Sequence, residues 1–183
     1  MNKQPEEEIL QLIADCKRGK RKAMHRLFKT YYGSLFTVCM RYAHCYEDAQ
    51  DMVNEGFMKI FAGLETYQPS GSFEAWMKTI MVNAALDYLR KYHHPAETVH
   101  YDDVADDVLQ HHDENEALAK LSTDELMQLI QQLPLMSRTV FNLYVFEDMP
   151  HAEIAKQLNI KEGTSHWHLN FARTKLKEAI MKR

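Results

Sequence analysis

The chain has 183 residues, enough for one ordinary domain or two small ones, and 45% of them are apolar and 26% charged. Only six glycines and five prolines are present, which excludes collagen-like, linker-like and turn-rich β-sandwich sequences. The net charge of −4, taken over the whole chain, disfavours a nucleic-acid partner. The negative charge is concentrated in one segment, however, because residues 93–126 alone carry ten acids and one lysine.

The beginning of the chain and its apolar stretches bear on localisation. The opening MNKQPEEEILQ has acids where a signal peptide carries basic and apolar regions, and the long uncharged stretches, Thr30–Met40 and Leu126–Ser137, have only eleven and twelve residues. A membrane-spanning helix needs about 18 apolar residues. None of the three cysteines lies in a CxxC pair. We therefore expect a cytoplasmic protein without a membrane segment, in a reducing compartment.

Residues 1–92 are predicted to form a small helical bundle. Apolar or small residues recur at helical spacing in three stripes, which belong to three successive helices. The stripes are Leu27, Tyr31, Leu35, Val38 and Tyr42; then Ala49, Met52, Val53, Gly56, Phe57 and Ile60; then Trp76, Ile80 and Ala84.

Residues 93–122 are predicted to be an acidic, histidine-rich linker, because their apolar residues are sparse and follow no sustained period. Helical patterns return over residues 123–183, and period-two alternation is absent throughout. The expected fold is therefore all-α, with two small helical domains joined by an acidic flexible linker.

The second domain contains the pattern of a helix-turn-helix. In DMPHAEIAKQLNIKEGTSHWHLNFARTKLK a helix beginning near Pro150 is expected to end after Leu158, with a turn at NIKEG and a second helix capped by Thr164. We expect Ile154, Leu158, Ile160 and Leu169 to be buried. The first turns of the second helix could then enter a major groove. On this segment alone, an ordinary helical hairpin is an equally good interpretation.

Four stretches together resemble a bacterial RNA polymerase sigma factor of the extracytoplasmic function type, group 4 of the sigma-70 superfamily. They are YEDAQDMVNEGFMKIF, SFEAWMKTIMVNAALDYLRK, QQLPLMSRTVFNLYVFEDMPHAEIAKQL and IKEGTSHWHLNFARTKLKE. The resemblance implies two helical domains, region 2 and region 4. It also implies binding to the β′ clamp and β flap of core RNA polymerase, to promoter DNA and to an anti-sigma factor, without a cofactor.

The resemblance implies that the helix around Asp48–Phe61 docks on the clamp coiled coil of the polymerase β′ subunit. The matching residues are Asp48, Asp51, Asn54 and Glu55. An acidic helix face can pair with basic residues of a partner helix and so set register and encounter rate. A solvated surface is the alternative for these residues.

The resemblance also assigns a site for the minus-ten promoter element. Tyr67 would form the wall of a pocket for an unstacked base and Asn83 would read its edge, with the backbone between Gln68 and Ser72 framing the pocket. Trp76 is expected in the core. Phosphate contacts are expected from Lys78, Arg90 and Lys91, and Asp87 is expected to pair with Arg90.

The helix expected to read the minus-thirty-five element departs from its family, because it carries rings and histidines where relatives have cations. Its candidate DNA contacts are Thr164, Ser165, His166, Trp167, His168, Asn170, Phe171, Arg173 and Lys175. Asn170 could read adenine and the rings could contact thymine methyl groups. Because histidine titrates near pH 6.5, His166 and His168 are expected to gain charge and strengthen DNA binding at mildly acidic pH.

Two other functions compete with promoter recognition. The first is a helical protein-interaction module whose helix-turn-helix no longer binds DNA, which the net acidity favours. The second is a metal or redox sensor built on Cys39, His44, Cys45 and the linker histidines, although their spacing matches no standard zinc site. No phosphate loop, nucleophile elbow or carboxylate pair is present, so we predict no metal site and no enzymatic activity.

Overall fold

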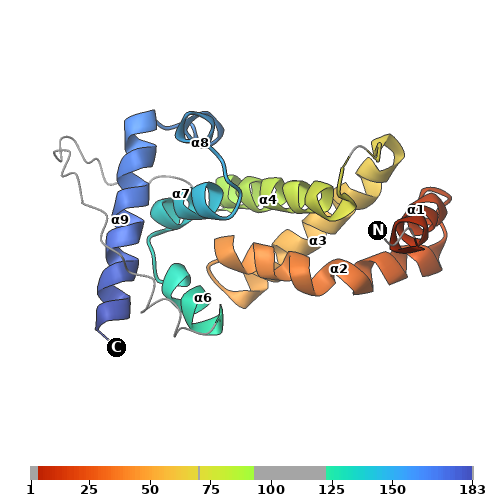
Figure 1. Ribbon diagram of the computed structural model, residues 1–183, viewed down its shortest axis with the longest axis horizontal. Coiled ribbons are helices and arrows are strands. Elements are labelled where there is room, and N and C mark those ends of the chain that lie inside the picture. The colour runs from red at the N-terminus through yellow and green to blue at the C-terminus, as the bar shows by residue number, and fades with distance from the viewer. Residues whose placement is uncertain (1–3, 70, 93–122, 183) are drawn as a thin grey trace. The chain divides into compact units, whose positions relative to one another are not determined.

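The computed structural model describes residues 4–69, 71–92 and 123–182, and every regular element within them is helical (Figure 1). The chain divides into two compact units, 1–93 and 94–183. The predicted linker, residues 93–122, lies outside the described residues. The first unit contains α1 (Gln4–Lys17), α2 (Arg21–Tyr42), α3 (Tyr46–Gly63), the short 3₁₀ turn η1 (Leu64–Thr66) and α4 (Phe73–Tyr92).

The core of the first unit lies between α2, α3 and α4, which pack on one another pairwise. Most members of the first two predicted stripes are buried in it, among them Leu27, Leu35 and Tyr42 from α2 and Met52 and Ile60 from α3. The third stripe is only partly right, because Ala84 is buried whereas Trp76 and Ile80 are half-buried, and α4 buries Met77 and Met81 instead. The α3–α4 contact is close at Gly56, where an added Cβ would lie 2.3 Å from Met81 Sδ. A glycine in the middle of α3 thus permits two helices to approach closely.

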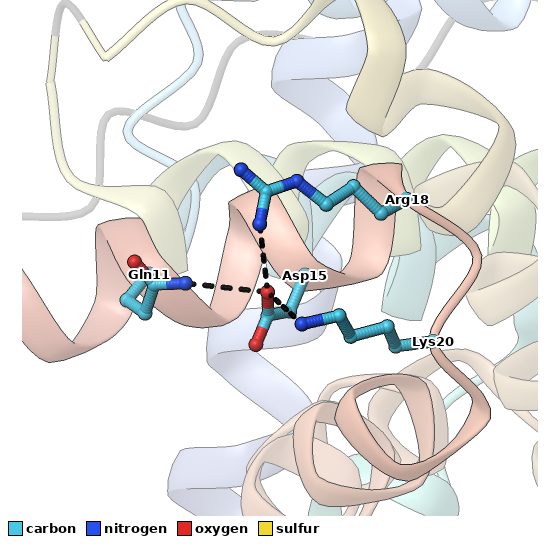
Figure 2. Close-up of polar contacts among 4 residues, drawn as sticks. All are labelled: Gln11, Asp15, Arg18 and Lys20. Carbon is cyan, nitrogen blue, oxygen red and sulfur yellow. Dashed lines mark hydrogen bonds and ion pairs between the residues drawn. The ribbon is translucent and has the colours of Figure 1, made fainter.

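Helix α1 lies within the predicted bundle but precedes the three helices that the apolar stripes indicated. It packs on both α2 and η1, with Ile13 and Cys16 buried. A tight turn at Gly19, with φ of +71°, joins it to α2. Figure 2 shows the polar contacts of this corner: Gln11, Arg18 and Lys20 all donate to Asp15 Oδ1, at 3.2, 3.5 and 2.9 Å. The hydrogen bond from Lys20 holds the pKa of Asp15 below its usual value.

The second unit contains α6 (Thr123–Gln131), α7 (Leu135–Val145), α8 (His151–Leu158) and α9 (Glu162–Met181). The long α9 packs against α6, α7 and α8, which makes it the centre of this unit. Its inward face presents Leu169, Ala172 and Leu176 to buried Val140 and Leu143 of α7. One long amphipathic helix therefore organises the second core.

The predicted helix-turn-helix is present as α8, a short turn and α9. Helix α8 ends at Leu158, its C-cap residue Asn159 adopts the left-handed conformation with φ of +54°, and the Ile160 N–H donates to the Ala155 carbonyl at 3.0 Å. This is a Schellman-type ending, in which asparagine replaces the usual glycine. Ile154 and Leu169 are fully buried as expected, whereas Leu158 and Ile160 are only half-buried.

The prediction that Thr164 caps α9 is wrong. The helix begins at Glu162, and its N-cap residue is Lys161, which is extended and lies three residues before Thr164. Glu162 in the first turn interacts favourably with the positive end of the helix dipole, and Gly163 is accommodated within the helix.

The cysteines do not gather with other metal ligands. Cys16 and Cys39 are buried and Cys45 is exposed, and the described residues contain no group of three or more His, Cys, Asp or Glu side chains able to hold a metal ion. Burial raises the pKa of the Cys39 thiol to about 12. In the described part of the chain, no helix is long and apolar enough to cross a membrane.

Candidate polymerase and promoter interfaces

The outward face of α3 is a mixed acidic and apolar surface. Asp51 and Asn54 are exposed, Glu55 is half-buried, and Met58 is exposed over 70% of its surface. Residues 51, 54, 55 and 58 follow helical spacing and share one face of α3. Glu55 and Met58 also line a shallow hollow with Lys59 and Ala62. This face combines a negative edge with an uncovered apolar side chain, as protein interfaces do.

Asp48 does not belong to that free acidic surface. Its carboxylate accepts hydrogen bonds from the Tyr88 hydroxyl at 2.9 Å and from the His44 backbone N–H at 3.3 Å. The second bond resembles a capping box, because a carboxylate in the first turn of α3 reaches back to a preceding N–H. Burial, and then the bond to Asp48, raise the pKa of Tyr88. We therefore revise the role of Asp48 from partner contact to tie between α3 and α4.

Three aromatic rings meet where η1 leads into α4. Tyr67 packs on Phe73 and Trp76 with ring centroids 5.1 and 4.8 Å away, and Phe73 stacks on Trp76 at 5.5 Å. The exposures differ from expectation, because Tyr67 is 9% exposed whereas Trp76 is half-buried. The expectation of Trp76 in the core is thus only partly met. The Tyr67 hydroxyl donates to the Gly71 carbonyl at 3.4 Å, which bridges the two ends of the loop between η1 and α4.

Within α4 the predicted minus-ten residues divide between two faces. At about 100° per residue, Trp76, Asn83 and Arg90 share one face of the helix. Lys78 lies on the opposite face, half-buried, so Asn83 and Lys78 are not brought together. The exposed Gln68 and Ser72 flank the loop, and Lys91 is exposed at the end of the helix.

The expected ion pair between Asp87 and Arg90 is present at 2.5 Å. Asp87 also binds Lys59 of α3 at 2.7 Å. All three side chains are roughly half-exposed, so each pair contributes at most about 1 kcal/mol. Separating Arg90 from Asp87 therefore costs little.

The outward face of α9 has Asn170 at its centre. His166, Asn170 and Arg173 are exposed, and Trp167 is half-buried beside them. Trp167 stacks on Phe171, one turn later, with ring centroids 5.2 Å apart. Thr164, Phe171 and Lys175 lie on the flank of this face, the first two of them half-buried.

Two predicted DNA contacts on α9 face the protein instead. Ser165 is fully buried and its hydroxyl lies 2.9 Å from His151 Nδ1. His168 is half-buried and its Nδ1 lies 2.9 Å from the hydroxyl of buried Ser137. We therefore remove Ser165 and His168 from the candidate DNA contacts. Burial lowers the pKa of His168 to about 4, so it stays neutral at pH 6 and the expected gain of charge there is wrong for this residue.

A column of rings joins α7, α8 and α9. Tyr144 stacks on His151 at 4.6 Å, and His151 stacks on His166 with only 3.7 Å between ring centroids. The Arg173 guanidinium lies 5.6 Å from the Tyr144 ring. Burial, followed by the proximity of His166, lowers the pKa of His151. His166 is therefore exposed while one face of its ring packs on His151.

Comparison with known families matches both units. Residues 27–94 match the family model described as Sigma-70 region 2, and residues 123–176 match the one described as Sigma-70, region 4. Most of the described residues therefore lie in one of these two matches.

Similar proteins are distant in sequence but match along their whole length. The RNA polymerase sigma-H factor of Pseudomonas aeruginosa is 25% identical over 187 residues, covering 96% of this chain and 95% of the relative. The ECF RNA polymerase sigma factor SigW of Bacillus subtilis is 25% identical over 183 residues, covering 94% and 96%. The sigma factor RpoE, solved with the anti-sigma factor NepR from Bartonella quintana, aligns with a TM-score of 0.50 at 18% identity, covering 99% and 98%. This last likeness indicates a shared fold.

Proposed function

The chain belongs to the sigma-70 family of RNA polymerase sigma factors, in its extracytoplasmic function group, and we propose that the surfaces described above carry out its part in promoter-specific initiation. It is a factor that directs core RNA polymerase to promoters, with region 2 for the minus-ten element and region 4 for the minus-thirty-five element. The observation that carries this function is the presence of both regions, in order, on one chain. It supports this function over a bare interaction module.

For polymerase binding we propose the outward face of α3. Asp51, Asn54 and Glu55 would pair with basic and polar groups of the β′ clamp, and Met58 would supply an apolar anchor that sequence reasoning missed. An exposed methionine one turn from polar residues can contribute packing where the polar groups contribute register. Its position outside the apolar stripe of α3 was the signal in the sequence.

For the minus-ten element we propose a base site at the start of α4. Asn83 would read the edge of an unstacked base, because its exposed amide offers both a donor and an acceptor. Trp76 is the more accessible ring for stacking, and Tyr67 would hold the loop through Phe73 and Gly71. Gln68 and Ser72 would frame the pocket. Arg90 and Lys91 would contact phosphates, whereas Lys78 lies on the other face of α4.

For the minus-thirty-five element we propose readout by the outward face of α9. Asn170 can bond the major-groove edge of adenine, and Trp167 can contact a thymine methyl group. Arg173 and Lys175, with Thr164, Phe171 and His166, would contact the backbone or groove edges. The short supply of cations on this helix predicts that region 4 alone binds duplex DNA weakly and with a shallow dependence on salt.

The remaining roles follow from the family. Sigma factors regulate transcription rather than catalyse a reaction, so we propose no enzymatic activity and no cofactor. We propose that the chain acts in the cytoplasm with core polymerase, contacting the β′ clamp and the β flap, and that an anti-sigma factor controls it. The anti-sigma complex of the Bartonella quintana protein supports this last proposal.

Run-off transcription tests the function directly. Core polymerase would be combined with the full chain and a library of promoter sequences, and the transcripts sequenced. We expect initiation from a defined subset of promoters only when the chain is present. A chain that binds core polymerase but selects no promoter would contradict the proposed function and favour the interaction module.

A further inference from the structure

The corner between α1 and α2 is the most basic part of the chain. Residues 17–29 contain seven lysines and arginines and no acid, in a protein whose net charge is −4. We define the basic corner by its seven exposed side chains: Arg18, Lys20, Arg21, Lys22, His25, Arg26 and Lys29. Nothing in the functions proposed above accounts for this concentration of charge.

Only part of the basic corner is neutralised within the fold. Asp15 binds Arg18 and Lys20, and Glu8 approaches Arg26 at 3.5 Å (Figure 2 shows the Asp15 contacts). Among the residues that the structure describes, no acid pairs with Arg21, Lys22 or Lys29. Residues 21, 22, 25, 26 and 29 span an arc of about 140° on one side of α2. This side is opposite to the buried Ala23 and Leu27.

The basic corner adjoins the proposed minus-ten site. Helix α1 packs on both α2 and η1, and Lys17 Nζ donates to the Tyr67 carbonyl at 3.3 Å. Lys17 is the residue directly before Arg18, so the corner begins where α1 contacts the aromatic loop. The basic corner is thus connected to this loop through α1.

We propose that the basic corner binds the phosphates of the single-stranded promoter DNA that flanks the unstacked base. The placement beside the minus-ten strand depends on the function proposed above. Exposed cations spread along a helix without an enclosing pocket suit an extended polyanion better than a small anion. The contacts are with phosphate, so they stabilise the open strand without reading its sequence.

A matched pair of variants tests the proposal. The first replaces Arg21, Lys22 and Lys29 with Gln, and the control replaces the exposed Lys156, Lys161 and Lys182 of the second unit with Gln. Both remove three positive charges from exposed sites. Thermal unfolding of each would establish that the fold is retained.

The first measurement uses the full chain without polymerase. A fluorescent oligothymidylate of twenty nucleotides would be titrated with the protein at several salt concentrations. With about 0.7 counterions released per single-strand phosphate contact, the slope of log affinity against log salt should fall by about 2 in the corner variant. The affinity at 0.1 M salt should fall at least about tenfold, and the control should stay within about twofold of the parent. Equal slopes in all three proteins would overturn the proposal.

The second measurement uses the holoenzyme and a promoter obtained by run-off selection. Non-template oligonucleotides would carry the minus-ten element alone or with six added nucleotides at either end. We expect one extension to strengthen binding by the parent and the control but not by the corner variant. Loss of core polymerase binding in the corner variant alone would overturn the proposal, because the corner would then be a polymerase contact.

The two measurements separate this proposal from the proposed function. If the corner variant loses oligothymidylate binding but the parent chain selects no promoter, the single-strand site stands and the proposed initiation function fails. If the parent chain selects promoters but the corner variant behaves like the control in both binding measurements, the initiation function stands and the basic corner has no part in it.

Discussion

Asn83 and Asn54 are chemically identical exposed side chains on neighbouring helices to which we assign different partners. Replacing Asn83 with Ala should weaken binding of the minus-ten single strand by about 1–3 kcal/mol, the usual cost of losing a base contact. Replacing Asn54 with Ala should weaken core polymerase binding by about 1 kcal/mol, the usual cost of a lost hydrogen bond. Each variant serves as the control for the other. Loss of both activities in both variants would mean that the two residues act through the fold.

His168 makes the stability of the second unit dependent on pH. Burial lowers its pKa to about 4, so the unfolded chain binds the proton more tightly than the folded one. The stability is fully present above about pH 6.5 and declines as the pH falls toward 4, by at most about 1.4 kcal/mol per pH unit for one proton. Urea unfolding at pH 7 and pH 5 should show this loss. In His168→Gln the loss should be smaller, and an unchanged pH dependence there would assign it to other groups.

Tyr67 shows how burial limits what a substitution can reveal. Its ring is largely covered by Phe73 and Trp76, so Tyr67→Ala removes core packing as well as any contact with a base. Removing a buried aromatic ring commonly costs about 3–5 kcal/mol of stability. Tyr67→Phe keeps the ring and removes only the bond to Gly71, and is the more informative variant for the loop.

At the scale of elements, two glycines in neighbouring helices should respond in opposite ways to alanine. Gly33 lies in α2 with no atom near an added Cβ, so Gly33→Ala should raise stability by about 0.5–1 kcal/mol through helix propensity alone. At Gly56 the new Cβ would meet Sδ and Cε of fully buried Met81. Overpacking costs about 1–3 kcal/mol and exceeds the gain in propensity, so Gly56→Ala should lower stability by about 1 kcal/mol. Equal stabilisation by both, measured by urea unfolding, would show that the α3–α4 contact yields easily.

The helices themselves were largely predictable, because each carries an apolar stripe that only a helix can bury. The three stripes of residues 1–92 correspond to α2, α3 and α4, and the helix-turn-helix was visible from its turn residues. The start of α9 was not predictable from local preference, since Thr164 is a better cap residue than Lys161, yet the helix begins at Glu162. Helix α1 was not predicted as an element, because the stripe analysis began at Leu27.

The sites were less predictable than the helices, because exposure depends on residues far apart in the chain. Asp48 is withdrawn from the acidic surface by Tyr88, which lies 40 residues away. Ser165 and His168 are withdrawn from the DNA-facing surface by His151 and Ser137. Spacing along one helix identifies a face, but it does not reveal which residues another helix will cover.

At the scale of the whole molecule, charge is segregated rather than balanced. Residues 93–126 carry nine excess negative charges, and the family resemblance implies that this segment follows a basic path in the polymerase. Replacing Asp102, Asp103, Asp106 and Asp107 with Asn should weaken holoenzyme assembly at low salt, and the difference should shrink as salt screens the interaction. Competition binding to core polymerase at several salt concentrations would measure this. Equal affinities of the variant and the parent at every salt concentration would contradict this prediction.

The unequal burial of the three thiols allows local opening of region 2 to be measured. Cys45 is exposed and should react with a thiol reagent at once, whereas Cys16 and Cys39 can react only when the helices that cover them separate. Their reaction rates in Cys45→Ser therefore report how often the bundle opens, α1 through Cys16 and the α2 core through Cys39. If α1 detaches on its own, Cys16 will be modified well before Cys39, and promoter DNA bound to the holoenzyme should slow it selectively.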